Sequence, residues 1–241
     1  MKGGILVAGT DTGVGKTIIA AGLVASLKDK GIDVGVMKPL ESGAPSFEST
    51  PIPRDAFYLK EIAGVKDDMD VINPYCFKDP LAPGVAAQQE GVEIDLKRIK
   101  GCYDELNGQH EFMVVEGVGG LLVPITNEIL FSQLIKLLNL PLLLVARSSL
   151  GTINHTLLSL FYCGRQGIDV VGFIINKVAP NVDPSEDSNP HIIAQFTKIP
   201  LLGSFPYLGD YAGVKDNKDF LAQIFIQHID VEVLFQRLGL A

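Results

Sequence analysis

The sequence predicts an α/β fold in which a mostly parallel sheet is covered by helices on both faces. Six apolar runs of strand length alternate along the chain with segments of helical character. Nearly continuous apolar strands indicate burial on both faces, and right-handed strand–helix–strand connections then make the sheet parallel. The 241 residues, 47% of them hydrophobic, suffice for one large core, so we expect a single domain over residues 1–241.

Each predicted strand is a short apolar run. The runs are ILVAG at 5–9, DVGVMK at 33–38, FMVVEG at 112–117, LPLLLVA at 140–146, IDVVGFIINK at 168–177 and PLLGSF at 200–205. The predicted helices cover residues 16–30, 55–63, 95–106, 129–138, 154–166 and 191–198, and a helical cap is expected over 220–238. Residues 41–54 are rich in Ser, Pro and Gly and predict a long loop at the carboxyl edge of the sheet, where ligands bind in such folds.

The first strand and the first helix are joined by GTDTGVGKT at 9–17, which we call the phosphate loop. Gly13 and Gly15 allow the backbone to turn its N–H groups toward an anion, and the following helix adds its positive end. Lys16 supplies a charge for the β and γ phosphates, and the Thr17 hydroxyl is suited to bind Mg²⁺. The loop therefore predicts phosphate binding and a P-loop NTPase-like fold.

The phosphate loop departs from the strict motif in one respect. A GxxxxGK[ST] motif would have glycine at Thr10, whereas the leading glycine is Gly9, one residue early. The loop is thus a variant, and the alternative interpretation is a glycine-rich turn followed by an ordinary helix.

Three charged residues are predicted to lie near the phosphate loop. Glu116 follows a buried strand, where a nucleotide site needs a metal ligand or a group that orients water; alternatively it is a solvated loop residue. Lys38 precedes Pro39 and is expected at the same edge as Lys16, either to stabilise a transferring phosphoryl group or as a solvated strand end. Asp55 is either a metal ligand or the N-cap of the helix that follows.

Other classes of site are disfavoured. GVGG at 117–120 is not a dinucleotide fingerprint, because Leu122 occupies the position of the last glycine, so no nicotinamide cofactor is expected. The four histidines have no ligand spacing, and no GxSxG elbow is present.

Composition limits the partners. Lys+Arg 20 against Asp+Glu 28 gives a net charge of -8, which argues against nucleic acid and against an anionic membrane surface. Three distant cysteines fit a reducing compartment, and no apolar run has the length of a signal peptide or a membrane span. We therefore expect a cytoplasmic protein.

The motifs taken together resemble the dethiobiotin synthetase family, the ATP-dependent enzymes that close the ureido ring in biotin synthesis. The resemblance follows the family's order through most of the chain. It rests on the phosphate loop, KPLESG at 38–43, RDA at 54–56, NPYCF at 73–77, AAQQEG at 86–91, VVEGVGGLLVP at 114–124, LGTINHTLLS at 150–159, INKV at 175–178 and LLGSFPYL at 201–208.

The resemblance implies a reaction of 7,8-diaminononanoate, CO2 and Mg-ATP through a carbamate and a carbamic-phosphoric anhydride. It implies catalysis by Lys38, Lys16 and Thr12, and metal binding by Thr17, Asp55 and Glu116. It implies nucleotide or cofactor binding by Gly13, Val14, Gly15, Lys16, Thr17, Ile18, Asp55, Glu116, Gly117, Val118, Gly119, Asn176, Lys177, Pro206, Tyr207 and Leu208. Asn176 and residues 206–208 would hold the adenine.

The resemblance also implies contacts with the diamine. Ser42 and Thr12 would lie against its reacting end, whereas Gly151 and Asn154 of a second subunit would receive its carboxylate, so a homodimer is expected. From the sequence alone, Thr152 is a plausible N-cap of a helix starting near Asn154, whose free N–H groups suit an anion.

The sequence departs from the family's pattern at two places, and other classes of protein with this fold must be considered. Gly13 stands where some members of the family carry an acidic residue, and the chain diverges beyond Tyr207, which leaves the ribose contacts open. A partitioning-type ATPase would share the fold but carries a signature lysine where this chain has Asp11. Phosphate acetyltransferase domains and cobyrinate-type amide synthases come with large additional domains, and a nucleotide-binding scaffold without chemistry is the remaining alternative.

Overall fold

The computed structural model describes residues 3–48, 50–180, 183–209 and 217–240, and its centre is a six-stranded sheet. The strand order is β10-β9-β8-β1-β7-β2, and each neighbouring pair is parallel. All six strands fall on the predicted apolar runs, so the predicted α/β fold is confirmed. The strands are β1 (Gly3–Gly9), β2 (Val34–Met37), β7 (Phe112–Gly120), β8 (Leu142–Arg147), β9 (Val170–Asn176) and β10 (Leu201–Phe205).

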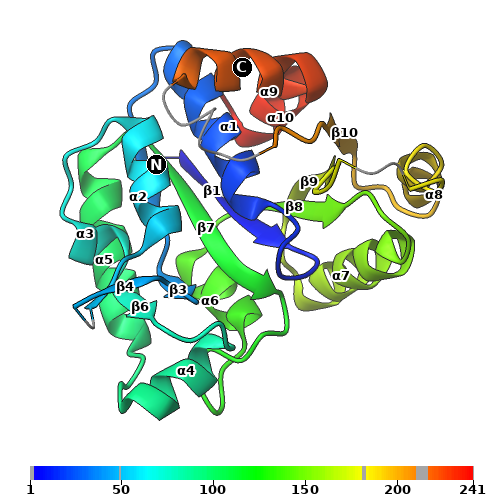
Figure 1. Cartoon of the computed structure of the whole chain (residues 1–241). Helices are drawn as coiled ribbons and strands as arrows, with labels where there is room; N and C mark the ends of the chain where they lie inside the picture. Colours follow the sequence, from blue (N-terminus) through cyan, green and yellow to red (C-terminus); the bar gives the residue numbers. More distant parts are fainter. Residues whose placement is uncertain (1–2, 49, 181–182, 210–216, 241) are drawn as a thin grey trace.

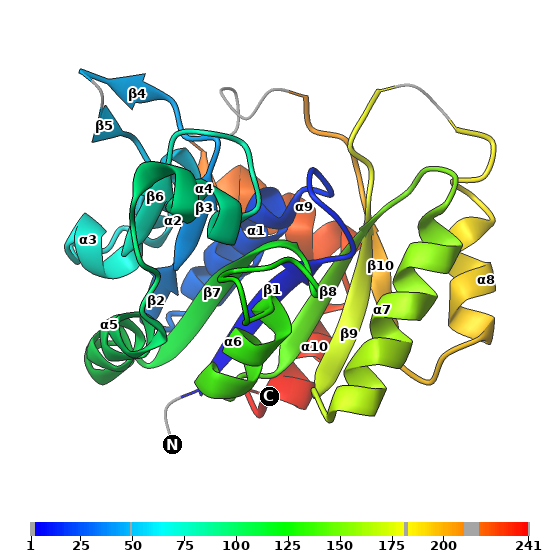
Figure 2. The ribbon, with the colours of Figure 1, turned by 90° about the horizontal axis from the view of Figure 1, so that it is seen from below.

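Helices cover both faces of the sheet, because its apolar strands must be shielded from water on each side. Figure 2 shows α6 and α7 in front of the strands and α1 and α9 behind them. The helix α2 packs against α1 and β2, and α8 packs against α7 and β10 (Figure 1). These helices are α1 (Lys16–Asp29), α2 (Arg54–Ala63), α5 (Leu96–Gln109), α6 (Phe131–Leu138), α7 (Thr152–Gln166) and α8 (Asn189–Gln195).

The predicted helical cap over 220–238 is present but interrupted. The structure has two helices there, α9 (Lys218–His228) and α10 (Val231–Leu238). The break lies at Asp230, whose backbone N–H donates to Leu202 O in β10 at 2.7 Å and whose carboxylate caps α10 through Val233 N at 3.0 Å. The edge strand thus holds the chain in an extended conformation between two helical stretches.

The segment between β2 and α5 contains elements that the sequence did not predict. A short parallel pair joins β3 (Leu40–Ser42) to β6 (Tyr75–Phe77), and β4 (Ser46–Phe47) pairs with β5 (Thr50–Pro51). Figure 2 shows the β4–β5 hairpin projecting beyond the sheet on the side of β2. The predicted long loop over 41–54 therefore contains short strands, which are too brief to show a period. Two short helices complete the segment, α3 (Met69–Ile72) and α4 (Pro83–Glu90).

No helix in the described part of the chain is long and apolar enough to cross a bilayer.

Candidate active site

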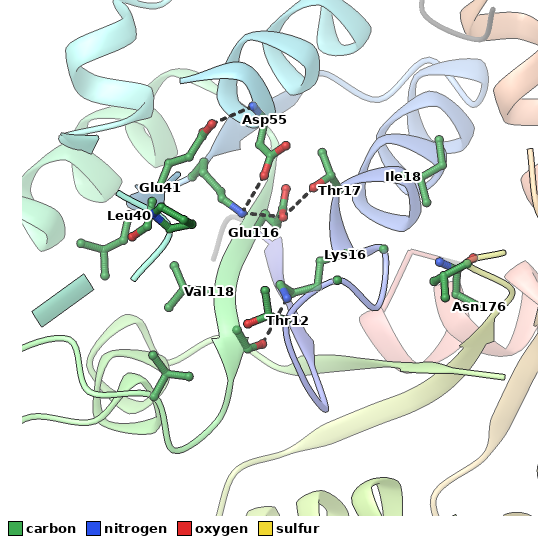
Figure 3. Close-up of a pocket in the computed structure, with 18 of the residues that line it drawn as sticks. Thr12, Lys16, Thr17, Ile18, Leu40, Glu41, Asp55, Glu116, Val118 and Asn176 are labelled. Atoms are coloured by element: carbon green, nitrogen blue, oxygen red, sulfur yellow. Dashed lines mark hydrogen bonds and ion pairs between the residues drawn. The ribbon is translucent and has the colours of Figure 1, made fainter. Parts of the chain in front are cut away.

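A cavity of about 620 Å³ opens at the carboxyl edge of the sheet, within the range of roughly 300–1,000 Å³ that holds small molecules. The phosphate loop, β3, the start of α2, β7 and the ends of β9 and β10 contribute to its wall (Figure 3). Most of the predicted site residues line it. They are Thr12, Gly13, Gly15, Lys16, Thr17, Ile18, Lys38, Ser42, Asp55, Glu116, Val118, Gly119, Asn176, Lys177, Pro206, Tyr207 and Leu208.

The phosphate loop has the conformation that its glycines predict. Gly13 and Gly15 have φ of 74° and 84°, in the left-handed region that favours glycine. A side chain at Gly15 would also meet Asn176, because a Cβ there would lie 2.0 Å from Nδ2 of that residue. The same amide donates to Val14 O at 2.8 Å and so ties the loop to the end of β9. Val14 thus takes part through its carbonyl and does not line the cavity.

Lys16 is the first residue of α1 and is almost fully buried. Its ammonium donates to the carbonyls of Asp11 and Gly119, each at 3.1 Å. Burial, with the charge of nearby Lys38, lowers the pKa of Lys16 to about 8. Lys16 is therefore held by backbone dipoles in a poorly solvated place.

Lys38 lies beside the phosphate loop, between the carboxylates of Asp55 and Glu116. Its Nζ is 2.5 Å from Glu116 Oε1, 3.4 Å from Asp55 Oδ2 and 3.1 Å from Gly117 O. Burial lowers the pKa of Lys38, but the negative charges of Glu116 and Asp55 raise it by more. The pKa of Lys38 therefore lies above its ordinary value. Lys38 is thus a buried cation, and the prediction of a solvated strand end is wrong. Gly117 takes part through its carbonyl.

The backbone of Lys38 is fixed by the segment that precedes β6. Lys38 N donates to Ile72 O at 2.9 Å, and the Asn73 side-chain amide donates to the Lys38 carbonyl. Pro39 follows and has no N–H of its own to pair. Ile72 and Asn73, the first residue of the NPYCF motif, therefore position Lys38, a role that the sequence alone did not reveal.

Thr17, Asp55 and Glu116 bring oxygen atoms into one cluster. Glu116 Oε1 accepts from Thr17 Oγ1 at 2.9 Å, and Glu116 Oε2 is buried without a hydrogen-bond partner among the described residues. Glu116 lies within β7 and is buried, so the prediction of a solvated loop residue is wrong. Two carboxylates and a hydroxyl beside a phosphate loop fit Mg²⁺, which retains waters and takes phosphate oxygens as further ligands. In the described part of the chain, no group of three His, Cys, Asp or Glu side chains could hold a metal.

The N-cap interpretation of Asp55 is wrong. The N-cap of α2 is Pro53, and Asp55 lies in the first turn with its carboxylate toward Lys38. The acceptor for the first turn is Glu41, which takes hydrogen bonds from Asp55 N at 3.0 Å and Ala56 N at 3.2 Å. Burial and the nearby Asp55 carboxylate raise the pKa of Glu41 to about 7. The sequence analysis missed Glu41 because its partners are reached only through the tertiary fold.

The other side of the cavity is formed by the ends of β9 and β10. Asn176 Oδ1 is buried there without a hydrogen-bond partner among the described residues, whereas Lys177 forms an ion pair with Glu186 at 2.9 Å. Tyr207 is 40% exposed. We call this side the base end, and the side with Lys16, Lys38, Asp55 and Glu116 the phosphate end. The ribose contacts, which the sequence left open beyond Tyr207, stay open, because residues 210–216 lie outside the described residues.

The residues predicted to contact the diamine fall into two groups. Ser42 and Thr12 line the cavity, and Ser42 Oγ is buried without a partner among the described residues. Gly151 and Asn154 lie outside the cavity lining, at the start of α7. The predicted N-cap Thr152 is wrong: Gly151, with φ 94°, is the N-cap, and Thr152 is a buried first residue of the helix.

Several lining residues were not predicted as site residues, because all of them except Glu41 are apolar and give no chemical signal. They are Leu40, Glu41, Pro80, Leu81, Ala82, Pro83, Val123, Val178, Phe205 and Gly209.

The sequence is similar to a family profile and to known proteins. A family profile described as "AAA domain" matches residues 3–215. The chain is 38% identical over 242 residues to the ATP-dependent dethiobiotin synthetase of Thermodesulfovibrio yellowstonii, covering 97% of this chain and 99% of that one. It is 39% identical to the Bacillus licheniformis enzyme of that name (98% and 97% covered) and 42% identical to that of Anaeromyxobacter dehalogenans (87% and 92%).

Solved structures give a fold-level match. The chain resembles the cell division ATPase MinD of Pyrococcus furiosus with a TM-score of 0.54 at 17% identity, covering 98% of this chain and 99% of that one. A ParA family ATPase from Chlorobium tepidum gives 0.53 at 15% identity, with 100% and 95% covered. At these identities the likeness concerns the fold alone.

Proposed function

The chain belongs to the ATP-dependent dethiobiotin synthetase family, and we propose that it closes the ureido ring of dethiobiotin from 7,8-diaminononanoate, CO2 and ATP. The observation that carries the proposal is the phosphate end of the cavity. Two buried lysines, Lys16 and Lys38, face one phosphate loop together with the carboxylates of Asp55 and Glu116. The second lysine supports phosphoryl transfer, because it adds a buried positive charge where negative charge develops on the moving phosphoryl group.

In the proposed reaction, one amine of the diamine adds to CO2 and loses a proton to form a carbamate. The carbamate oxygen then attacks the γ-phosphorus, and ADP leaves. The second amine attacks the carbonyl carbon of the carbamic-phosphoric anhydride and loses a proton, and phosphate leaves with its bonding electrons as the ring closes. Lys38 and Lys16 meet the negative charge on the carbamate and on the transferring phosphoryl group. Ser42 and Thr12 orient the diamine, and Asn176 Oδ1 accepts from an exocyclic amine of the base; neither Ser42 Oγ nor Asn176 Oδ1 has a hydrogen-bond partner within the described residues.

The proposed metal ligands are Thr17, Asp55 and Glu116. When bound, Mg²⁺ neutralises phosphate charge and orients the β and γ oxygens.

The proposal is tested by incubating the protein with Mg-ATP, bicarbonate and 7,8-diaminononanoate. We expect dethiobiotin, identified by mass, in one-to-one ratio with released phosphate, and little phosphate release when the diamine is omitted. ATP hydrolysis that does not respond to the diamine, without dethiobiotin, would contradict the proposal.

We further propose that the working unit is a homodimer, in which α7 of one subunit receives the carboxylate of the diamine bound in the other. The carboxylate lies about 8 to 10 Å from the amines in an extended chain, by the reach of extended backbone. In the first turn of α7, Thr152 N donates to Ser149 O at 3.2 Å, but the N–H groups of Ile153 and Asn154 have no acceptor among the described residues and suit an anion. Leu150, Leu158 and Phe161 are 77%, 58% and 66% exposed, an apolar surface beside Asn154 that suits a second copy.

The dimer is tested with Asn154→Ala, which should raise the KM for the diamine several-fold while the KM for ATP changes little. Mixing it with an inactive Lys16→Ala variant should restore activity, because one site of each hybrid dimer contains neither substitution. A fully active monomer by light scattering at the assay concentration would contradict the arrangement.

A further inference from the structure

We propose that Glu41 is a positioning residue, which holds Asp55 in place by capping the helix that carries it. The inference rests on the function proposed above, in which Asp55 helps to bind Mg²⁺. Glu41 lies in β3, three residues after Lys38, and its side chain reaches across to the start of α2 (Figure 3).

The start of α2 has no cap of its own. Its N-cap, Pro53, has no side-chain acceptor, so the first N–H groups of the helix need partners from elsewhere. Glu41 supplies two: Oε1 accepts from Asp55 N at 3.0 Å and Oε2 from Ala56 N at 3.2 Å. A carboxylate at this position is also favoured by the positive end of the helix.

Burial makes this cap hard to replace. Ala56 is fully buried and Glu41 is 6% exposed, so water cannot readily take over the two hydrogen bonds. The Asp55 side chain, in contrast, is 43% exposed, and its only ion pair or hydrogen bond among the described residues is the 3.4 Å contact with Lys38. The position of the Asp55 carboxylate therefore depends on where the backbone of α2 begins.

The geometry also separates this role from metal binding by Glu41 itself. Both of its oxygens face backbone N–H groups, so Glu41 acts on the site through Asp55. Its own strand is anchored, because β3 pairs with β6 and Glu41 lies opposite Cys76. Glu41 thus couples the strand that follows Lys38 to the helix that carries Asp55.

The test measures Mn²⁺ affinity in the presence of ADP by electron paramagnetic resonance. Glu41→Ala should weaken Mn²⁺ binding by about tenfold or more, the usual effect of removing a group that orients a metal ligand. Glu41→Gln should weaken Mn²⁺ binding less, because the amide keeps one of the two oxygen acceptors. This variant provides the test if Glu41→Ala does not fold. Hydrogen exchange at Asp55 and Ala56 should become faster in both variants.

Asp95→Ala is the matched control. Asp95 caps α5 through Lys97 N at 2.8 Å, and α5 contributes no residue to the cavity wall. This variant should lower the Tm but leave Mn²⁺ affinity unchanged, so a loss of affinity in it would mean that general destabilisation explains the Glu41 result.

A double-mutant cycle with Asp55→Asn tests whether Glu41 acts through Asp55. Adding Glu41→Ala to Asp55→Asn should weaken Mn²⁺ binding little further, since the group being positioned is already altered. Fully additive effects, or normal Mn²⁺ affinity in Glu41→Ala, would overturn the inference while the diamine-dependent reaction still stood. If Asp55→Asn itself left Mn²⁺ affinity unchanged, the proposed metal role of Asp55 would fail, and the inference with it.

Discussion

The two ends of the cavity are built in opposite ways. At the phosphate end, buried charges contact each other and backbone carbonyls, as Lys38 does with Glu116 at 2.5 Å. At the base end, the Lys177 side chain is 27% exposed and its ammonium is paired with the Glu186 carboxylate. Asn176 contributes a neutral amide.

This difference indicates that the phosphate end serves catalysis and the base end serves binding. Preorganised charges in a poorly solvated site act on charge that develops during a reaction, whereas neutral contacts bind ground state and transition state alike. Substitutions at the phosphate end should therefore lower kcat, and those at the base end should raise KM.

The largest effect is expected for Lys16→Ala. Loss of this cation should cost roughly 3 kcal/mol or more in the barrier to phosphoryl transfer, which is more than a hundredfold in rate. Single-turnover formation of ADP measures it, with circular dichroism as the control for folding. Near-normal turnover would remove Lys16 from the chemistry.

Lys16 should also lower the free energy of unfolding of the nucleotide-free protein. Its folded-state pKa of about 8 lies below the ordinary 10.5, so the unfolded chain binds more protons between these values and stability rises with pH there. Lys16→Met should therefore stabilise the nucleotide-free protein at pH 7 by about 1 to 3 kcal/mol, and less above pH 10. Urea unfolding at both pH values measures this, and Lys177→Met at the base end, which should give no such gain, is the control.

Lys38→Ala should lower kcat on the order of 100-fold while ATP affinity changes much less. Its ammonium lies beside the carboxylates and is expected to meet charge that appears only during transfer. Kinetic titration with ATP separates the two effects. If only ATP affinity fell, Lys38 would be a ground-state contact, and the contrast between the two ends would weaken.

Amide substitutions of the proposed metal ligands come next. Asp55→Asn and Glu116→Gln keep the shape but remove charge, so the Mg²⁺ concentration for half-maximal activity should rise by about an order of magnitude. A Mg²⁺ titration of the initial rate gives the value. An unchanged titration for Asp55→Asn would mean that Mg²⁺ is held without it.

The smallest effect is expected at the base end. Asn176→Ala removes the acceptor proposed for the base and the tie to Val14 O, and should raise the KM for ATP by roughly tenfold or less with kcat nearly unchanged. Steady-state kinetics with ATP and GTP would show this. A large fall in kcat would instead assign Asn176 to the shape of the phosphate loop.

The sequence by itself determined the sheet and the charged residues of the phosphate end. Long apolar strands and a glycine-rich loop are local signals, because backbone conformation and burial on both faces act through neighbouring residues. Lys16, Thr17, Lys38 and Asp55 could therefore be chosen from their positions at the ends of strands and helices, and Glu116 from its place after a buried apolar run.

Only the tertiary structure decided how these residues are held. The segment between β2 and α5 has no period of its own. Its parallel pair exists because β3 meets β6, and the Asn73 side chain reaches the Lys38 carbonyl across 35 positions. Glu41 caps a helix that begins 13 residues later, and Asn176 meets the phosphate loop across 162 positions. Such hydrogen bonds form only when the fold brings together two segments that are far apart in the sequence. A local pattern of residues therefore cannot predict them.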